Sequence, residues 1–207
     1  MREAALRKAA ADDWTMFEDD ATEELRHAIC VSNLAYCVAK QYGLYEDPCH
    51  ELAVAGMLHD IGKLRISGYL YGRDEDTLNI EEMKYVRMHP RLGYETLIRY
   101  DFSDNVLESI LYHHENYDGS GYPENLAGTQ IPVGARILRV CDTFAALTSD
   151  RPYRRAFDRQ TAIELMIEEV KNFDMKVFLA FQTVIHDEEL QHKWAPRSFR
   201  VGIAELE

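Results

Sequence analysis

Apolar residues recur every three or four positions along almost the whole chain, which is the spacing of one face of an α-helix. Alternating apolar and polar residues, which indicate β-strands, are almost absent. The chain has 207 residues, of which 46% are hydrophobic, so it is long enough to bury a core of its own. The sequence therefore predicts an all-α fold that forms a single helical bundle domain.

Capping and helix-breaking residues divide this pattern into segments. We expect a helix over residues 1–18, and we expect Asp19 or Asp20 to cap a second helix over about 22–42. Glycines and prolines between residues 116 and 131 predict a loop of about fifteen residues, a length that is more often functional than idle. Further helices are expected over about 49–61, 79–88, 103–115, 132–149, 158–172 and 174–191, with a new helix starting at Pro90.

Composition argues against several classes of protein. No apolar run approaches the roughly 18 residues of a membrane span, and the first residues are too charged for a signal peptide, so we expect a cytoplasmic protein without membrane insertion. The formal net charge of −13 argues against DNA binding. The four cysteines form no CxxC pair, and we expect free thiols. An anionic ligand must therefore be bound locally, by metal ions and a few arginines.

His59 and Asp60 follow an apolar run at the end of a helix that we expect to be buried. One imidazole nitrogen and two carboxylate oxygens at one point can hold one divalent ion and reach towards a second. Burying several more such side chains in a helical core is costly unless metal ions bind them. Imidazoles and carboxylates without a thiolate favour iron, manganese, nickel or zinc over magnesium or calcium. The other candidates are His89, His113, His114 and Asp142, with Glu23 and His27 at an i, i+4 spacing on one helix face.

Ordered motifs around these residues carry a family resemblance. The motifs are His59-Asp60-Ile61-Gly62-Lys63, His89-Pro90-Arg91-Leu92-Gly93, the run from His113 to Pro123 that includes Gly121-Tyr122-Pro123, the run from Ile131 to Ile137, and Asp142-Thr143-Phe144 with the run from Thr148 to Arg154. With these motifs in this order, the chain resembles the HD-GYP subfamily of HD-domain phosphohydrolases over about residues 20–185. The resemblance implies an HD-type helical bundle with a Gly-Tyr-Pro loop insertion.

The resemblance implies a bacterial phosphodiesterase that hydrolyses cyclic di-GMP to the linear dinucleotide, to GMP, or to both. It implies a centre of two or three divalent metal ions, iron or manganese, with attack by a hydroxide that bridges metal ions. Diguanylate cyclases and sensor or receiver domains are the partners expected besides the cyclic dinucleotide. Two alternatives stay open: a cyclic-dinucleotide receptor or interaction module that binds without turnover, and an HD phosphohydrolase that acts on another nucleotide, such as cyclic GMP-AMP.

The resemblance also assigns roles to individual residues. Asp60 is expected to be catalytic as the bridge between metal ions, and Lys63, one turn beyond His59, is expected to point at the scissile phosphate. The expected metal ligands are Glu23, for a third ion, and His27, His59, Asp60, His89, His113, His114 and Asp142. The expected substrate-binding residues are Lys63, Tyr122, Arg151 and Arg154.

Some of these assignments have an alternative. Tyr122 could stack on a guanine, contact a partner or pin its own loop, and the two arginines could instead form a solvated basic helix end. Ala145 stands where many family members carry an aspartate that lies near the metal centre. We expect residues 1–18 to be an N-terminal helix, either a linker or a signalling helix, residues 19–192 to be the catalytic domain, and residues 193–207 to be a C-terminal tail.

Overall fold

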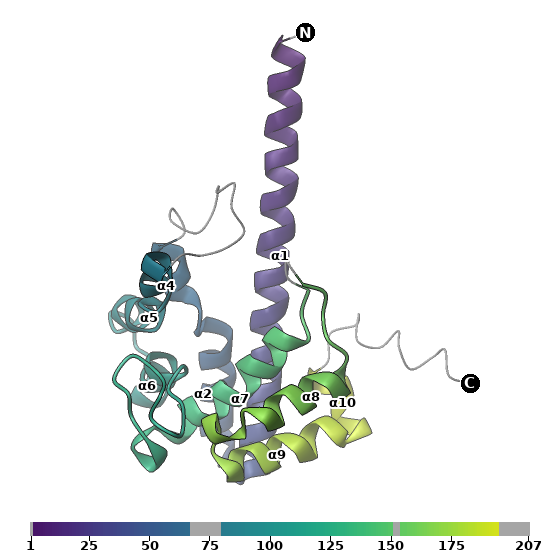
Figure 1. Cartoon of the computed structure of the whole chain (residues 1–207). Coiled ribbons are helices and arrows are strands. Elements are labelled where there is room, and N and C mark those ends of the chain that lie inside the picture. The colour runs from purple at the N-terminus through teal and green to yellow at the C-terminus, as the bar shows by residue number, and fades with distance from the viewer. Residues whose placement is uncertain (1, 67–79, 151–153, 195–207) are drawn as a thin grey trace, which may run out of the picture.

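The computed structural model describes residues 2–66, 80–150 and 154–194, with side chains described from residue 22 onward except at 80–82 and 191–193. Every regular element in these ranges is a helix, so the predicted all-α class is confirmed (Figure 1). Three short 3₁₀ helices are η1 (Ile61–Arg65), η2 (Gly128–Gln130) and η3 (Val170–Asn172). The α-helices are α1 (Arg2–Tyr42), α2 (Glu46–Leu58), α4 (Ile80–Val86), α5 (His89–Leu97), α6 (Asp104–Tyr112), α7 (Val133–Leu147), α8 (Arg159–Glu168), α9 (Met175–His186) and α10 (Glu188–Trp194).

The first helix differs from the prediction. α1 is one helix of 41 residues, so the expected break with a cap at Asp19 or Asp20 is wrong. Its sequence contains neither glycine nor proline, and a helix that has already formed propagates through such a stretch at little cost. In Figure 1 the N-terminal half of α1 projects beyond the other helices, and its C-terminal half runs through them.

The last part of the bundle also differs from the prediction, because the single helix expected over about 174–191 is two helices. Asp187 lies between them in an extended conformation, and its side chain accepts hydrogen bonds from the backbone N–H groups of Glu189 and Leu190. Asp187 therefore caps the start of α10. α10 ends at Trp194, a residue that we had placed in the tail, and its buried ring packs edge to face on Phe144. Asn79, at which the helix expected over about 79–88 would begin, lies outside the described residues.

The hydrophobic core forms around the C-terminal half of α1, against which α2, α7 and α9 pack. Leu34 and Val38 of α1 are fully buried, as are Phe144 of α7 and Phe181 of α9, whose rings meet edge to face. The four cysteines are buried and form no disulfide bond, as predicted. The three helices that surround α1 include α7, which carries Asp142, so core packing fixes that residue relative to α1.

A close crossing of α1 and α2 sets the positions of two predicted ligands. At Gly56 the backbone of α2 comes so close to α1 that an added Cβ atom would lie 2.9 Å from Cα of Ser32. The Ser32 hydroxyl donates a hydrogen bond to the Ala53 carbonyl oxygen across the same crossing. Because these two helices touch here, His27 on α1 and His59 after the end of α2 lie near each other.

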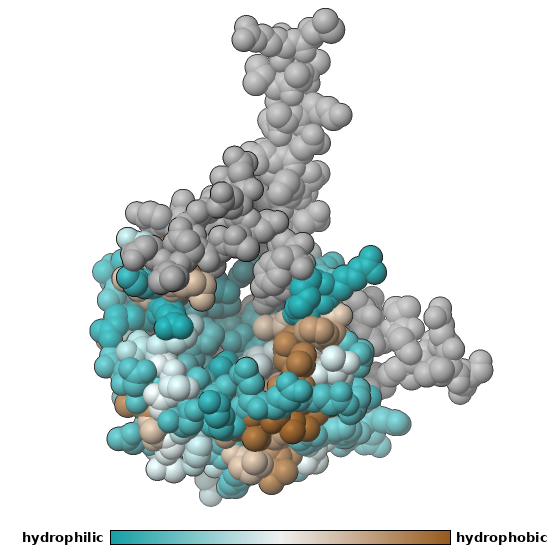
Figure 2. Space-filling model, viewed as in Figure 1, coloured by the Kyte–Doolittle hydropathy of each residue, from teal (hydrophilic) through white to brown (hydrophobic). Residues whose placement is uncertain are grey.

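The described surface is mostly hydrophilic on the face drawn in Figure 2, with a group of hydrophobic side chains over α8 and α9. Ile167, Met175 and Leu179 are the large hydrophobic residues of these two helices that are exposed. None of the described helices combines the length and the apolar composition needed to cross a lipid bilayer.

Candidate metal centre

The predicted ligands come from different parts of the chain and meet at one end of the core. His27 lies on α1, His89 is the first residue of α5, and Asp142 lies on α7. His59 and Asp60 occupy the short junction between α2 and η1, where the chain changes from an α-helix to a 3₁₀ helix. His113 is the C-cap of α6, and His114 follows it. Five of the predicted ligands therefore stand at helix ends, whereas His27 and Asp142 are buried residues inside α1 and α7.

One group of three possible ligands consists of His27, His59 and Asp142, all of them buried. His27 Nε2 lies 3.1 Å from Asp142 Oδ1 and 3.3 Å from His59 Nε2. His59 Nε2 lies 3.7 Å from the same Asp142 oxygen. Two ligand atoms that each lie about 2.1 Å from one ion are roughly 3 Å apart, so these separations fit a shared ion.

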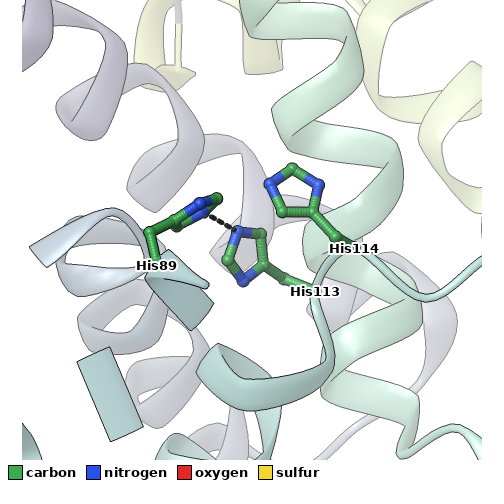
Figure 3. A group of neighbouring side chains, drawn as sticks. All are labelled: His89, His113 and His114. Atoms are coloured by element: carbon green, nitrogen blue, oxygen red, sulfur yellow. Dashed lines mark hydrogen bonds between the residues drawn. The ribbon is translucent and has the colours of Figure 1, made fainter. Parts of the chain in front are cut away.

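A second group consists of His89, His113 and His114, whose rings converge as Figure 3 shows. His89 Nε2 lies 3.2 Å from His113 Nε2. The His114 ring centroid lies 4.9 Å from that of His89 and 4.1 Å from that of His113. Three imidazoles that meet in this way are able to bind a divalent metal ion.

The Asp60 carboxylate lies between the two groups. Its Oδ2 atom is 3.2 Å from His59 Nε2, and its Oδ1 atom is 3.2 Å from His89 Nε2. Each carboxylate oxygen therefore faces a histidine of a different group. This is the arrangement expected of a carboxylate that bridges two metal ions.

The hydrogen bonds of three histidines show that a cation fits between them. The Nδ1 atoms of His59, His89 and His113 lie 2.8, 2.7 and 2.6 Å from the carbonyl oxygens of Gly56, Val86 and Ile110. Each Nδ1 must carry a proton to donate to its carbonyl, so in the neutral ring Nε2 presents a lone pair to the centre.

If these histidine rings were neutral, hydrogen-bond acceptors would face one another in the buried centre. The Nε2 lone pairs of His89 and His113 would face each other, and Asp60 Oδ1 is buried and accepts no hydrogen bond from the described residues. Such contacts repel unless a proton or a metal ion lies between the atoms. The donor set therefore fits divalent metal ions, held by His27, His59 and Asp142 on one side, by His89, His113 and His114 on the other, and by Asp60 between them.

The charges of the centre favour metal binding. Burial opposes ionisation of Asp60 and Asp142, but neighbouring His59 and other donors hold the pKa of both carboxyl groups well below the usual range. Burial would lower the pKa of His59, but Asp60 and Asp142 raise it to about 10. Burial lowers the pKa of His114 to about 3. The nearby His89 and Arg139 also lower this pKa, whereas Asp142 raises it. A metal ion that binds here would replace the proton on His59.

Lys63 lies beside the bridging carboxylate, and Glu23 does not lie in the centre. Lys63 Nζ is 2.7 Å from Asp60 Oδ2 and 4.0 Å from Glu24 Oε1, a neighbour that the sequence did not indicate. Glu23 instead forms an ion pair with Arg26, and its side chain is 41% exposed. Lys63 therefore lies beside the candidate metal ligands, and a third metal ion at Glu23 stays a prediction.

The predicted substrate-binding residues have different surroundings. Arg151 lies outside the described residues. Arg154 donates to the carbonyl oxygens of Ala146 and Leu147 at 2.9 and 3.1 Å, and its guanidinium carbon lies 4.3 Å from the Phe157 ring centroid. Its guanidinium therefore already stabilises the chain after α7, and its role in phosphate binding stays a prediction.

Tyr122 of the Gly-Tyr-Pro loop stacks on a candidate ligand. Its ring centroid lies 4.8 Å from that of His114, with an angle of 28° between the rings, and the guanidinium carbon of Arg87 lies 5.4 Å from the Tyr122 centroid. Burial raises the pKa of the Tyr122 hydroxyl. These contacts support the interpretation in which Tyr122 pins its loop against the centre.

Glu115 is a positioning residue whose role the sequence analysis missed, although it directly follows the two histidines. Its side chain is buried, and its two carboxylate oxygens accept hydrogen bonds from the backbone N–H groups of Glu124 and Leu126 at 2.7 and 3.1 Å. Burial raises the pKa of the Glu115 carboxyl despite these hydrogen bonds. The carboxylate therefore ties the far side of the Gly-Tyr-Pro loop to the residue next to His114.

Replacing Glu115 by alanine is expected to loosen this loop. Two backbone N–H groups in partly buried hydrogen bonds would lose their acceptor, which should destabilise the fold by about 1–3 kcal/mol. Chemical denaturation would measure the loss, and hydrogen exchange should speed up at the amides of residues 124 and 126. Glu124→Gln is the control, because its side chain forms only a half-exposed ion pair with Arg91 and should change stability by less than about 1 kcal/mol. Equal stabilities of the two variants would contradict the positioning role of Glu115.

Comparison with known proteins gives the family of this chain. Residues 4–177 match the family described as HD domain. The chain belongs to this family. The match confirms the HD-domain resemblance that the motifs indicated. A solved protein described as a HDG"Y"P protein, Bd1817 from Bdellovibrio bacteriovorus, has the same fold, with a TM-score of 0.63. That match has 19% identity and covers 79% of this chain and 53% of the other.

Curated relatives of this HD domain chain include bacterial phosphodiesterases. A protein of Pseudomonas aeruginosa named cyclic di-GMP phosphodiesterase is 38% identical over 156 residues, which are 75% of this chain and 37% of the relative. The response regulator RpfG of Xanthomonas campestris, also named cyclic di-GMP phosphodiesterase, is 41% identical over 138 residues, which are 64% of this chain and 35% of the relative. The chain thus spans little more than a third of the length of these relatives.

Proposed function

We propose that this chain hydrolyses a 3′,5′-phosphodiester bond of cyclic di-GMP at a centre of two divalent metal ions, iron or manganese. The observation that carries the proposal is the Asp60 carboxylate, whose two oxygens each face a buried histidine, His59 of the first ligand group and His89 of the second. A pair of metal ions held by a shared carboxylate is a recurrent arrangement in enzymes that cleave phosphate esters. The names of the two relatives described above support cyclic di-GMP as the substrate.

The residues of the chain supply the parts that such a reaction needs. Divalent ions bound here would lower the pKa of a water molecule and polarise the phosphoryl oxygens. Asp60 would hold them in a fixed relation, and the carbonyl-bonded histidines would keep their Nε2 atoms oriented. Lys63 would attract a non-bridging phosphate oxygen and balance the negative charge that develops there. Water attack requires no nucleophilic side chain.

Cyclic GMP-AMP is a second candidate substrate. A relative from Vibrio cholerae that is named a 3′3′-cGAMP-specific phosphodiesterase is 34% identical over 155 residues, which are 74% of this chain and 36% of the relative. The two nucleotides share both phosphodiester groups and differ in one base, so the metal centre would treat them alike. Residues that contact the bases would decide between them. The expected diguanylate cyclase, sensor and receiver partners stay predictions.

Incubation of the metal-loaded protein with cyclic di-GMP tests this proposal. The protein would be purified without oxygen, loaded with Fe(II) or Mn(II), and the products separated by chromatography. We expect the linear dinucleotide or GMP, and we expect the activity to disappear after chelation and to return with the metal. Cyclic GMP-AMP in a parallel reaction would establish the selectivity. Binding of cyclic di-GMP without product would instead indicate a receptor, and turnover of mononucleotides alone would indicate a different HD phosphohydrolase.

A further inference from the structure

Two arginines one turn apart on α7 differ in their partners. The Arg136 side chain is only 13% exposed and forms an ion pair with the buried carboxylate of Asp174. Arg139 is also partly buried, but no carboxylate forms an ion pair with it among the residues whose side chains are described. A partly buried guanidinium without an acidic partner is uncommon, above all in a chain with a net charge of −13.

Three contacts hold the Arg139 guanidinium in one place. Its Nε atom donates to Asn116 Oδ1 at 2.9 Å, and its Nη1 atom donates to Thr143 Oγ1 at 2.9 Å. Its central carbon lies 5.8 Å from the centroid of the Phe173 ring. None of these partners is charged, so they fix the group without neutralising it, and no described residue accepts from Nη2.

The position of Arg139 places this charge beside the metal centre. It precedes Asp142 by three residues, which puts the two side chains on one face of α7. Its partner Asn116 follows His114 by two residues, and its partner Thr143 follows Asp142 directly. The guanidinium therefore lies between α7 and the start of the Gly-Tyr-Pro loop. It is close to Asp142 of the first ligand group and to His114 of the second.

We propose that Arg139 binds a phosphate of the cyclic dinucleotide, namely the phosphate that is not being cleaved. This inference rests on the proposed function, because it assumes a substrate with two phosphate groups. The metal ions and Lys63 would neutralise the phosphate that reacts, and the second phosphate brings another negative charge towards an acidic protein. Arg139 offers it a fixed donor pair at Nη2, and guanidinium groups suit phosphate oxygens.

Arg154 is less suited to this role. Its Nη1 and Nη2 atoms donate to backbone carbonyl oxygens of α7 and of the chain that follows. Moving it onto a phosphate would leave those carbonyl groups without their donors. Arg139 would gain a partner without giving one up.

Kinetics with two substrates test the proposal. The variant Arg139→Gln would be compared with the wild type on cyclic di-GMP and on bis(p-nitrophenyl) phosphate, which has one phosphodiester group and therefore no second phosphate. Loss of a charge-assisted hydrogen bond should raise KM for the cyclic dinucleotide roughly 10- to 100-fold. Hydrolysis of bis(p-nitrophenyl) phosphate and the metal content should stay within about twofold of the wild type, and Arg139→Lys should restore part of the affinity. Arg99→Gln, at an exposed position after α5, is the matched control and should leave both substrates unaffected.

Binding of a phosphorothioate analogue of cyclic di-GMP, measured by calorimetry, gives a second readout that needs no turnover. We expect the affinity of Arg139→Gln to fall by the same factor, with a weaker dependence on salt than in the wild type. Unchanged KM and unchanged affinity would overturn the role of Arg139, as would equal losses on both substrates, which would indicate a general effect on the centre. A wild-type protein that cleaves only bis(p-nitrophenyl) phosphate would instead refute the proposed function.

Discussion

Replacing Asp60 by asparagine is expected to reduce turnover of cyclic di-GMP at least about 1,000-fold and to remove at least one of two bound metal ions. The amide has the size of the carboxylate, so packing should be preserved. It offers one oxygen in place of two and carries no charge, whereas the carboxylate lies 3.2 Å from a histidine of each group. In the proposed centre both ions would depend on this one side chain, so the expected effect is larger than for the loss of a terminal ligand.

Metal analysis of the purified variant, together with its turnover, checks this expectation. Glu95→Gln makes the same chemical change in an exposed ion pair with Arg65 and should leave metal content and turnover as in the wild type. His113→Ala is a useful comparison, since it should deplete mainly the ion held by the second histidine group. An Asp60→Asn protein with the metal content of the wild type would refute the bridging role.

The sequence was informative about the centre because buried imidazoles and carboxylates need partners. His59, Asp60 and the histidines after α6 stand at helix ends, and their residue types alone indicate metal binding wherever a helical core buries them. Their division into two groups could not be read in this way. It depends on how α1, α5 and α7 pack, and no periodicity in one segment specifies its crossing with another.

Side chains on exposed faces were harder to place. Glu23 and His27 share one face of α1 by spacing, but the Glu23 carboxylate pairs with Arg26 rather than turning into the core. Asp19 and Asp20 are good capping residues, yet α1 continues through them because no residue there breaks the helix. The preference of a single residue for a helix cap or a helix face is weak, and the packing of distant segments decides which conformation the chain adopts.

Replacing Gly62 by alanine is expected to destabilise the protein by about 3 kcal/mol and to weaken metal binding at the second histidine group. An added Cβ atom would lie 2.0 Å from the His89 carbonyl oxygen and 2.6 Å from the Gly93 nitrogen. These are backbone atoms of α5, so no side-chain rotation can relieve the overlap. The start of α5 would have to move away from η1, and His89 would move with it, away from Asp60.

Gly93→Ala is the matched control, because it changes the other glycine of the same contact. Its added Cβ atom would lie 3.4 Å from the Cγ2 methyl groups of Ile61 and Ile110 and 3.5 Å from the Gly62 nitrogen. These are ordinary van der Waals distances, so stability should change by no more than about 1 kcal/mol. Thermal unfolding and metal titration of both variants would separate the two cases. Equally small effects in both variants would mean that the contact tolerates a methyl group at either position, and that something other than the close approach of η1 to α5 holds His89 beside Asp60. A selective loss in Gly62→Ala would show that a residue with no side chain sets the distance between the two metal groups.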